Sequence, residues 1–266
     1  MANILVTGAS GFIGSELCKF FSCSPHNIIE ANRSTLDVAS REDVDFFFDN
    51  NKVDVVLHAA IKGGRRTKKD THENFSENIT MFENLLRHKE RYKLFISFGS
   101  GAESRKDTHY GLAKSIIANK IKKHDNMLNL RLFGCFGINE SPTRFIRSCV
   151  SNLMKDNPIV IHQNKYMDFF SIDDLCRVVN FYVQNINTTL PRELDMCYSP
   201  QVTLLDIAEY IKSLTQSDLR IIIEEKSLGS PYVGDPSMIQ GLDIPLEGLW
   251  TGVENMVKGL LIQENE

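Results

Sequence analysis

Residues 1–21, MANILVTGASGFIGSELCKFF, place three glycines at positions 8, 11 and 14, directly after a run of apolar residues. A secretory signal would need a positively charged start, a longer apolar core and a small-residue cleavage site, so we expect none here. Glycines also destabilise an apolar helix. The pattern instead predicts a strand that turns sharply into a helix, at a point where a ligand approaches the backbone itself.

Short apolar runs alternate with longer amphipathic stretches over the first two-thirds of the chain. Strands are expected at residues 3–8, 27–33, 53–60, 93–100 and 129–137, and helices at 14–22, 41–50, 74–89 and 110–124. The strands are apolar almost throughout, as in a parallel sheet that is covered on both faces. The alternation predicts an α/β fold of the Rossmann type, with a doubly wound parallel sheet.

The rhythm changes after about residue 138. Helices are expected at 142–155, 171–185, 203–214 and 246–261, and strands within 158–170 and 218–225. Thr203 and Asp206 have the spacing of a capping box. Neither a repeat nor a low-complexity linker separates the two parts. We therefore predict a first domain over 1–137 and a smaller C-terminal α/β lobe over 138–266, with residues 165–190 packing back onto the first domain.

Composition excludes several classes of protein. The 266 residues are 42% apolar and 24% charged, with a net charge of −4, so we expect no nucleic-acid partner. No apolar run is long enough to span a membrane. The six cysteines are scattered without a C-x-x-C pair, which indicates reduced thiols and a cytoplasmic protein. The seven histidines show no metal-ligand spacing, so no metal is expected.

The three glycines follow a predicted strand and open a predicted helix, the setting that makes G-x-x-G-x-x-G informative. Gly8 would permit the tight turn, Gly11 the approach of a diphosphate to the main chain, and Gly14 close helix–sheet packing. The N–H groups and the partial positive charge of the helix N-terminus favour phosphate. We interpret the stretch as a dinucleotide cradle; the alternative is a glycine-rich turn without a ligand.

The tip of the second predicted strand decides which dinucleotide fits. An acidic residue there would pair with the 2′-hydroxyl of the adenosine ribose, but this chain has Asn32 and Arg33. Arg33 could bind a 2′-phosphate through charge and bidentate hydrogen bonds, which favours NADP over NAD. Glu30 is the alternative partner of the ribose. Asp37 is expected to accept a hydrogen bond from the adenine amino group, or else to cap the following helix.

Tyr110 and Lys114 lie four residues apart in YGLAK and would share one face of a helix. A tyrosine hydroxyl, with an unperturbed pKa of about 10, is a poor proton shuttle at neutral pH. A neighbouring ammonium and an oxidised nicotinamide both favour the phenolate and lower that pKa. Ser100 ends the fourth predicted strand and would hydrogen-bond a substrate carbonyl that Tyr110 protonates. The alternative is a surface tyrosine beside an unrelated lysine.

These motifs together resemble the extended short-chain dehydrogenase/reductase family, the superfamily of NAD-dependent epimerases and dehydratases. The resemblance rests on TGASGFIG (7–14), VLHAA (56–60), Ser100 and YGLAK (110–114). The stretch LDVASREDVDFFFDNNKVDVVLHAAIKGG (36–64) looks particularly like GDP-L-fucose synthases and related nucleotide-sugar reductases. DFFSIDDL (168–175) and GDPSMIQGL (234–242) also resemble C-terminal elements of nucleotide-sugar epimerases and reductases.

The resemblance implies roles for individual residues. Ser100, Tyr110 and Lys114 would be the catalytic triad, with Lys114 also holding the nicotinamide ribose. The cofactor would be lined by Gly8, Gly11, Phe12, Ile13, Gly14, Asn32, Arg33, Asp37, Val38, Ala59, Ala60 and Lys114. Residues 1–137 would bind NADP (or NAD), and 138–266 mainly the nucleotide sugar. The resemblance further implies polysaccharide biosynthesis as the setting, and a homodimer through the helix of Tyr110.

The chain departs from the family at positions that decide the reaction. Fucose synthases epimerise with a Cys and a His, and those positions fall near Ala102 and Arg144, which are unsuited to proton exchange at carbon. Dehydratases need an acidic pair just after the catalytic residue, where this chain has Gly101 and Ala102. What remains is NADP-dependent reduction of a nucleotide-linked 4-keto sugar, preferably a 6-deoxy one. The alternatives are an NAD-dependent nucleotide-sugar 4-epimerase and a non-catalytic NAD(P)-sensing protein.

Three basic residues, Lys62, Arg144 and Lys165, are assigned to the substrate. Lys62 opens the basic cluster KGGRRTKKD (62–70), which could attract the nucleotide sugar or the cofactor phosphates, or only face solvent. Arg144 could reach the substrate diphosphate bidentately. The resemblance leads us to expect an arginine at position 167, where this chain has Met167. Lys165, two residues earlier, could replace that arginine as a contact of the diphosphate.

Overall fold

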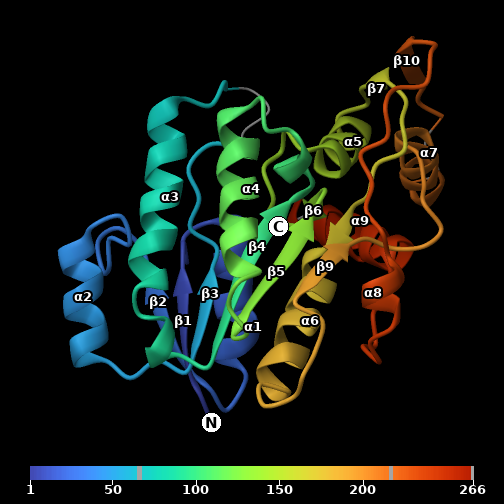
Figure 1. Ribbon diagram of the computed structural model, residues 1–266. Helices are drawn as coiled ribbons and strands as arrows, with labels where there is room; N and C mark the ends of the chain where they lie inside the picture. The colour runs from blue at the N-terminus through green and yellow to red at the C-terminus, as the bar shows by residue number, and fades with distance from the viewer. Residues whose placement is uncertain (65–67, 216–217, 265–266) are drawn as a thin grey trace. The chain divides into compact units, whose positions relative to one another are not determined.

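The computed structural model describes residues 1–64, 68–215 and 218–264, which Figure 1 shows as a ribbon. The chain begins with strand β1 (Asn3–Thr7) and helix α1 (Phe12–Ser22), as the glycine pattern predicts. It continues through β2 (Asn27–Ala31), α2 (Arg41–Asn50), β3 (Val55–His58), α3 (His72–Leu86), the 3₁₀ turn η1 (Lys89–Arg91), β4 (Leu94–Ser100), the 3₁₀ turn η2 (Gly101–Ser104), α4 (His109–Ile121) and β5 (Met127–Leu132).

The described residues form a six-stranded sheet in the order β2-β1-β3-β4-β5-β9, where β9 is Glu193–Met196. β1 pairs in parallel with β2 and β3, and β3 pairs in parallel with β4. In Figure 1, α3 and α4 lie side by side over one face of the sheet and α1 lies behind it. The predicted Rossmann-type α/β fold is confirmed.

The first of two compact units comprises Met1–Arg131 and Val178–Leu194. β3 and β4 are buried along their whole length, which explains why their sequences are apolar without alternation. One face of the sheet packs against α2, α3 and α4 through a cluster that includes Leu5, Val44, Phe48, Val56, Phe82, Leu85, Phe95 and Ile117. This packing fixes the carboxyl ends of the strands, where the predicted site residues lie.

The second compact unit comprises Leu132–Arg177 and Asp195–Glu266. Its helices are α5 (Phe145–Met154), α7 (Leu204–Leu214), α8 (Ser237–Gln240) and α9 (Leu249–Glu264). It has two short parallel pairs: β7 (Ile159–Gln163) with β10 (Ile221–Glu225), and β6 (Cys135–Phe136) with β8 (Phe170–Ser171). Helix α6 (Ile172–Gln184) begins in this unit and continues into the first. The functions predicted for residues 1–137 and 138–266 stay predictions.

Helix starts follow local capping rules. The capping box predicted at Thr203 is confirmed, because its hydroxyl accepts the Asp206 N–H at 3.2 Å and Asp206 accepts the Thr203 N–H at 2.7 Å. Ser40, rather than Asp37, caps α2 by accepting the Asp43 N–H at 3.2 Å. Asp37 is therefore not the N-cap of α2.

The run 129–137, predicted as one strand, is divided. β5 ends at Leu132, and Cys135–Phe136 pairs instead with β8. At the break, the Gly134 carbonyl accepts the Phe170 N–H at 2.7 Å, and a Cβ on Gly134 would lie 2.8 Å from the Phe169 ring. Contacts with a segment over thirty residues away decide this division, so an uninterrupted apolar pattern could not predict it.

Candidate active site

The glycine turn leaves no room for side chains. Gly8 has φ +68°, and a Cβ there would lie 2.7 Å from the backbone of Ala60, at the end of β3. A Cβ on Gly14 would lie 2.2 Å from the Gly8 carbonyl oxygen. Both positions therefore require glycine, because the strand end and the first turn of α1 are in direct backbone contact.

The start of α1 is suited to a diphosphate. Gly11 is the N-cap and has no side chain that could cap the helix. The first-turn N–H groups of Phe12, Ile13 and Gly14 precede the internal hydrogen bonds of the helix and carry its partial positive charge. These residues fit the diphosphate of a dinucleotide, since their N–H groups are available to it and Gly11 adds no side chain at the helix end.

Thr7 and His58, which lie within the quoted motifs but were given no role there, hold the ends of β1 and β3 together. The Thr7 hydroxyl hydrogen-bonds His58 Nδ1 at 2.8 Å and accepts the Ala60 N–H at 3.3 Å. The Ala59 N–H donates to the Thr7 carbonyl at 3.2 Å. Burial, and secondly the charge of Lys114, lowers the pKa of His58 to about 3, so its ring is neutral. Ala59 and Ala60 are thereby fixed beside the glycine turn.

Arg33 and Lys62 share one carboxylate. The Arg33 guanidinium pairs with Glu77 Oε1 on α3, and Lys62 Nζ lies 3.0 Å from Glu77 Oε2. Buried Asn78 also holds the Lys62 backbone, accepting its N–H at 2.8 Å and donating to its carbonyl at 2.9 Å. Lys62 thus shares its carboxylate partner with Arg33, the residue predicted to bind a 2′-phosphate. Arg65 and Arg66 of the basic cluster lie outside the described residues.

The loop predicted to hold adenine is internally ordered. Asp37 Oδ1 accepts the Ala39 N–H at 3.0 Å. Asn84 of α3 donates to the carbonyl of buried Val38 at 3.1 Å. Asn32 accepts hydrogen bonds from Ser34, which fix the tip of β2. These contacts show a formed loop; the cofactor roles of Asn32, Asp37 and Val38 stay predictions.

Ser100 ends β4 and opens η2. Its Oγ accepts the Ala102 N–H at 3.1 Å, and its own N–H donates to Glu103 Oε1 at 2.9 Å. The side chain of Ser100 is buried, with the residue 8% exposed. Because its oxygen accepts a backbone hydrogen bond, the hydroxyl hydrogen remains to be donated.

Tyr110 and Lys114 lie on one face of α4, as their spacing predicts. Lys114 Nζ is 5.9 Å from the centre of the Tyr110 ring and donates to the Phe98 carbonyl of β4 at 2.5 Å. Burial lowers the pKa of Lys114 to about 8, while the nearby charge of Glu103 raises it. A buried ammonium thus faces a tyrosine ring, the arrangement that the proton-transfer hypothesis requires.

Two glycines allow close packing around Tyr110. A Cβ on Gly64 would lie 2.8 Å from the Tyr110 ring, so the loop after β3 contacts it through glycine. A Cβ on Gly111 would lie 2.1 Å from the Arg105 carbonyl oxygen and 2.5 Å from that of Ala102. The turn that carries Ser100 therefore packs directly against the start of α4, and Gly111 makes this possible.

Two of the three residues assigned to the substrate lie in the second unit. Arg144 precedes α5, and its Nε is 3.8 Å from Glu140 Oε2. Burial raises the pKa of Glu140 to about 8, and among the described residues its Oε1 has no hydrogen-bond partner. Lys165 Nζ lies 5.9 Å from the centre of the Tyr232 ring. Arg144 and Lys165 are thus placed within this unit, and their contact with a substrate stays a prediction.

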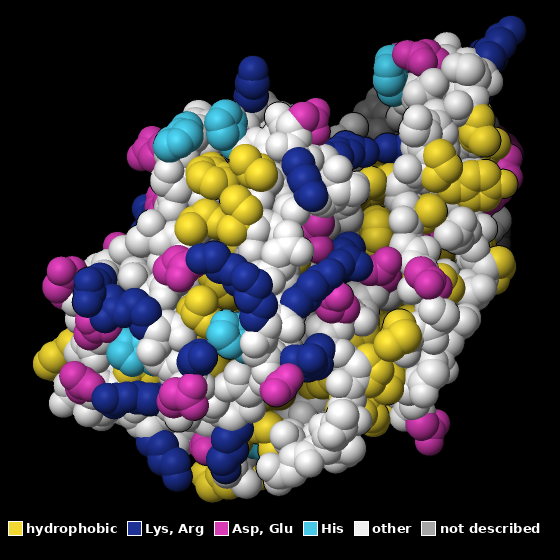
Figure 2. All heavy atoms as spheres, viewed as in Figure 1, with side chains coloured by type: hydrophobic (Ala, Val, Ile, Leu, Met, Phe, Trp, Pro, Cys, Tyr) yellow, Lys and Arg dark blue, Asp and Glu magenta, His cyan; other side chains and the backbone are white. Residues whose placement is uncertain are grey.

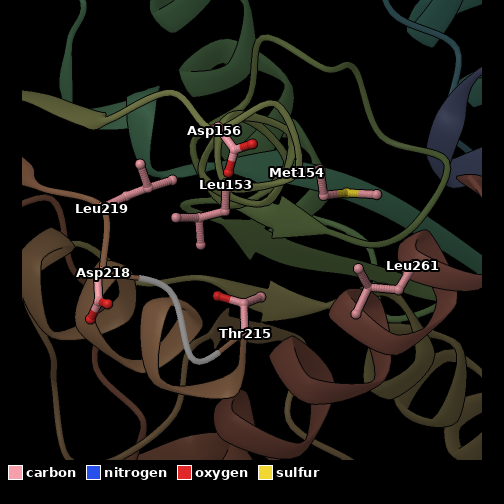
Figure 3. Close-up of a pocket in the computed structure, with 7 residues that line it drawn as sticks. All are labelled: Leu153, Met154, Asp156, Thr215, Asp218, Leu219 and Leu261. Atoms are coloured by element: carbon pink, nitrogen blue, oxygen red, sulfur yellow. The ribbon is translucent and has the colours of Figure 1, made fainter.

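A pocket of about 520 Å³ in the second unit contains none of the predicted site residues (Figure 3). It is lined by Leu153, Met154, Asp156, Thr215, Asp218, Leu219 and Leu261. Among residues 1–64, 68–215 and 218–264, the structure shows no cluster of His, Cys, Asp and Glu able to hold a metal ion. Over the same residues, every helix is too short or too polar to cross a bilayer. Basic and acidic side chains intermingle on the face seen in Figure 2.

Solved structures with the same fold include enzymes of sugar-nucleotide chemistry. GDP-mannoheptose C4 reductase from Campylobacter jejuni, with NADP bound, has a TM-score of 0.80 at 17% identity over 98% of both chains. A GDP-L-fucose synthetase from Naegleria fowleri has a TM-score of 0.78 at 14% identity, covering 99% of this chain and 94% of that one. UDP-glucose 4-epimerase from Thermus thermophilus, in complex with NAD, has a TM-score of 0.79 at 14% identity, covering 97% and 99%.

The sequence itself matches a family model. Residues 4–194 match the model of the NAD dependent epimerase/dehydratase family, which confirms the resemblance inferred from the motifs. The matched segment contains the glycine turn, Ser100 and the YGLAK helix. Since it spans well over half of the chain, this protein belongs to the NAD dependent epimerase/dehydratase family.

Proposed function

We propose that this protein is an NADPH-dependent reductase of a nucleotide-linked 4-keto sugar, and that the sugar is a 6-deoxy one. The observation that carries the proposal is the buried Lys114 ammonium facing the Tyr110 ring, on the helix that packs against the Ser100 turn. Solved structures of the same fold include a C4 reductase with NADP bound. The bound cofactor, in its reduced form NADPH, would supply the hydride.

Each residue of the triad has a separate task in this proposal. Ser100 would donate its hydroxyl hydrogen to the keto oxygen and hold it in place. Tyr110 would give the proton that this oxygen needs as it becomes a hydroxyl. Lys114, while protonated, would lower the pKa of Tyr110 and so make that transfer possible near neutral pH. The hydrogen bond to the Phe98 carbonyl would keep the Lys114 ammonium in its position beside Tyr110.

The residues around Ser100 favour simple reduction. Removal of water from a sugar needs an acid and a base close to the reacting carbons. Gly101 and Ala102 provide neither, and the Glu103 carboxylate is engaged with the Ser100 N–H and with Arg131 Nε, the latter at 2.9 Å. Proton exchange at a sugar carbon would also need a base, and Ala102 and Arg144 are unsuited to it.

The preference for NADP is proposed from two cations at one position. Arg33 and Lys62 converge on Glu77 beside the tip of β2. A 2′-phosphate that replaced the Glu77 carboxylate as their partner would bind both cations, so Lys62 would contact the cofactor rather than the sugar. Arg144 and Lys165 remain the proposed contacts of the nucleotide diphosphate.

A 4-epimerase is the second candidate, because the chain belongs to an epimerase/dehydratase family and shares its fold with a UDP-glucose 4-epimerase. An epimerase oxidises its substrate and then reduces the keto sugar again, so its cofactor shows no net change. The test is a panel of GDP-, UDP- and dTDP-linked 4-keto-6-deoxy sugars and the corresponding 4-hydroxy sugars. Stoichiometric NADPH oxidation with a keto sugar supports the reductase. Inversion of a hydroxy sugar without net oxidation would replace it with the epimerase.

Assembly and location are part of the proposal. Leu112 and Ile116 of α4 are only partly buried, and Figure 2 shows hydrophobic side chains gathered over α3 and α4. We propose that this surface forms a homodimer. The six cysteines are all free thiols, which agrees with a reducing, cytoplasmic location.

A further inference from the structure

Glu103 is a buried carboxylate that the proposed reaction does not use. Its side chain is 9% exposed, although the residue lies in the η2 turn. An ionised carboxylate is costly to bury unless it is paired and hydrogen-bonded. Glu103 meets this requirement with three donors: the Ser100 N–H at 2.9 Å, Asn129 Nδ2 at 3.1 Å and Arg131 Nε at 2.9 Å.

These contacts tie Ser100 to the next strand of the sheet. Ser100 ends β4, whereas Asn129 and Arg131 belong to β5. A single carboxylate therefore fixes the backbone of the proposed catalytic serine against two side chains of the neighbouring strand. Gly99 is part of the arrangement, because a Cβ there would lie 2.4 Å from Glu103 Oε1.

Glu103 and Lys114 are held at neighbouring positions of β4. Lys114 Nζ donates to the Phe98 carbonyl, and the Glu103 carboxylate lies against Gly99 and accepts the Ser100 N–H. In the part of the chain that the structure describes, the charged and titratable groups that act on Lys114 are neutral His58 on β3, Tyr110 on α4 and Glu103 on η2. Of these three, Glu103 supplies the negative charge, which raises the pKa of Lys114. Arg131 faces Glu103 from β5 and is itself balanced by Glu193 at 3.3 Å, which lies 3.1 Å from Lys122. Arg131 is thus shared, and Glu103 retains an effect on the buried ammonium.

We propose that Glu103 is a positioning residue: its carboxylate fixes the Ser100 backbone and places a negative charge beside the segment Phe98–Ser100, which also binds the Lys114 ammonium. The assignment rests on the proposed function for the roles of Ser100 and Lys114. The charge coupling between Glu103 and Lys114 does not depend on that function and can be measured without substrate or cofactor.

The test measures the pKa of Lys114 by NMR in protein labelled with ¹³Cε-lysine, with Lys114→Met used only to assign the resonance. Glu103→Gln retains a hydrogen-bond acceptor but removes the charge, and it is expected to lower the pKa of Lys114 by about one unit or more. Glu103→Asp should retain most of the wild-type value. Glu83→Gln is the matched control, because Glu83 of α3 pairs with Lys120, which lies on α4 as Lys114 does. This variant should leave the pKa of Lys114 unchanged.

A second measurement needs no variant, in case Glu103→Gln does not fold. The Ser100 amide of the wild-type protein is expected to be strongly protected from hydrogen exchange, because its N–H donates to the buried Glu103 carboxylate. An unprotected Ser100 amide would overturn the proposal, since Glu103 would then not hold that backbone. An unchanged Lys114 pKa in a folded Glu103→Gln variant would overturn it as well.

Activity supplies the third measurement. Reduction should fail as pH rises and Lys114 loses its proton, so the alkaline limb of kcat/KM should move to lower pH by about one unit in Glu103→Gln. Glu103→Asp should restore the wild-type profile. If the NMR shift is found but no keto sugar is reduced, the proposed function fails and the coupling stands. An unmoved alkaline limb in an active variant would overturn the role of Glu103.

Discussion

Single charges held at fixed places determine what this site can do. Lys114 is buried against the Phe98 carbonyl, and Arg33 and Lys62 meet at Glu77. The spacing of YGLAK predicted that Tyr110 and Lys114 share a helix face, because helical geometry is local. The sequence could not indicate Glu103, whose partners on β5 lie about twenty-six residues away and are brought close only by the sheet.

The first prediction concerns Lys62. Lys62→Met should raise the KM for NADPH about tenfold, the effect of losing about 1.4 kcal/mol, because one of two cations facing the 2′-phosphate is removed. The KM for NADH and for the sugar should stay unchanged. Lys93→Met is the control, since Lys93 also pairs with a carboxylate, Asp54, but lies before β4. A rise in the KM for the sugar alone would contradict this assignment and indicate that Lys62 contacts the substrate.

The second prediction concerns Glu140. Burial raises its pKa to about 8, so between the unfolded value of 4.5 and about 8 the folded state binds a proton that the unfolded state has lost. Stability contributed by this group therefore falls as pH rises through that window. The free energy of unfolding of Glu140→Gln, taken relative to that of the wild type, should therefore rise by about 2–4 kcal/mol from pH 5 to pH 8. Urea unfolding at both pH values measures the difference.

The control for that experiment is Glu254→Gln, because Glu254 pairs with Lys258 on the solvent side of α9. Its effect on the free energy of unfolding should be small and similar at pH 5 and pH 8. An effect of Glu140→Gln that is the same at both pH values would contradict the assignment of a protonated Glu140.

Elements position these residues through backbone contact. The turn η2 packs against the start of α4, and Gly8, just after β1, packs against the backbone of Ala59 and Ala60, just after β3. The sequence predicted most elements, because strands of a covered parallel sheet and capped helices have local signals. It failed at 129–137, where the partner strand β8 decides which residues leave the sheet.

The third prediction concerns the contact between η2 and α4 at Gly111. Gly111→Ala should separate η2 from α4, because the new methyl group would lie 2.1 Å from the Arg105 carbonyl oxygen. We expect a loss of about 1–3 kcal/mol in the free energy of unfolding, together with a lower kcat, since Ser100 moves relative to Tyr110. Gly241→Ala is the control, with its nearest atom at 3.5 Å. Full activity of Gly111→Ala would contradict this account of the packing.

The whole chain passes between its two compact units three times. It crosses after Arg131, after Arg177 and after Leu194, and β5, α6 and β9 each continue across a boundary. The sequence showed the absence of a linker and the change of rhythm near residue 138. It also predicted that residues 165–190 pack back onto the first domain. The segment that belongs to the first unit is Val178–Leu194, whose bounds are set by packing and not by composition.

The fourth prediction follows from this connectivity. The two units should unfold in one cooperative transition, because three continuous elements belong to both. Trp250, the one tryptophan of the sequence, lies on α9 of the second unit, with its ring centre 4.8 Å from that of Tyr210. Its fluorescence should report the same midpoint as circular dichroism, and NADPH should raise both midpoints. Two separate midpoints would contradict cooperativity.

The most direct test of the proposed reaction follows the hydride. The protein would be given NADPH deuterated at the transferable position, together with each nucleotide-linked 4-keto-6-deoxy sugar, and the product examined by NMR. We expect one deuterium at carbon 4 of the sugar, one NADP formed per product, and loss of both in Tyr110→Phe with cofactor binding retained. A sugar inverted at carbon 4 without consumption of NADPH, or full turnover by Tyr110→Phe, would contradict it.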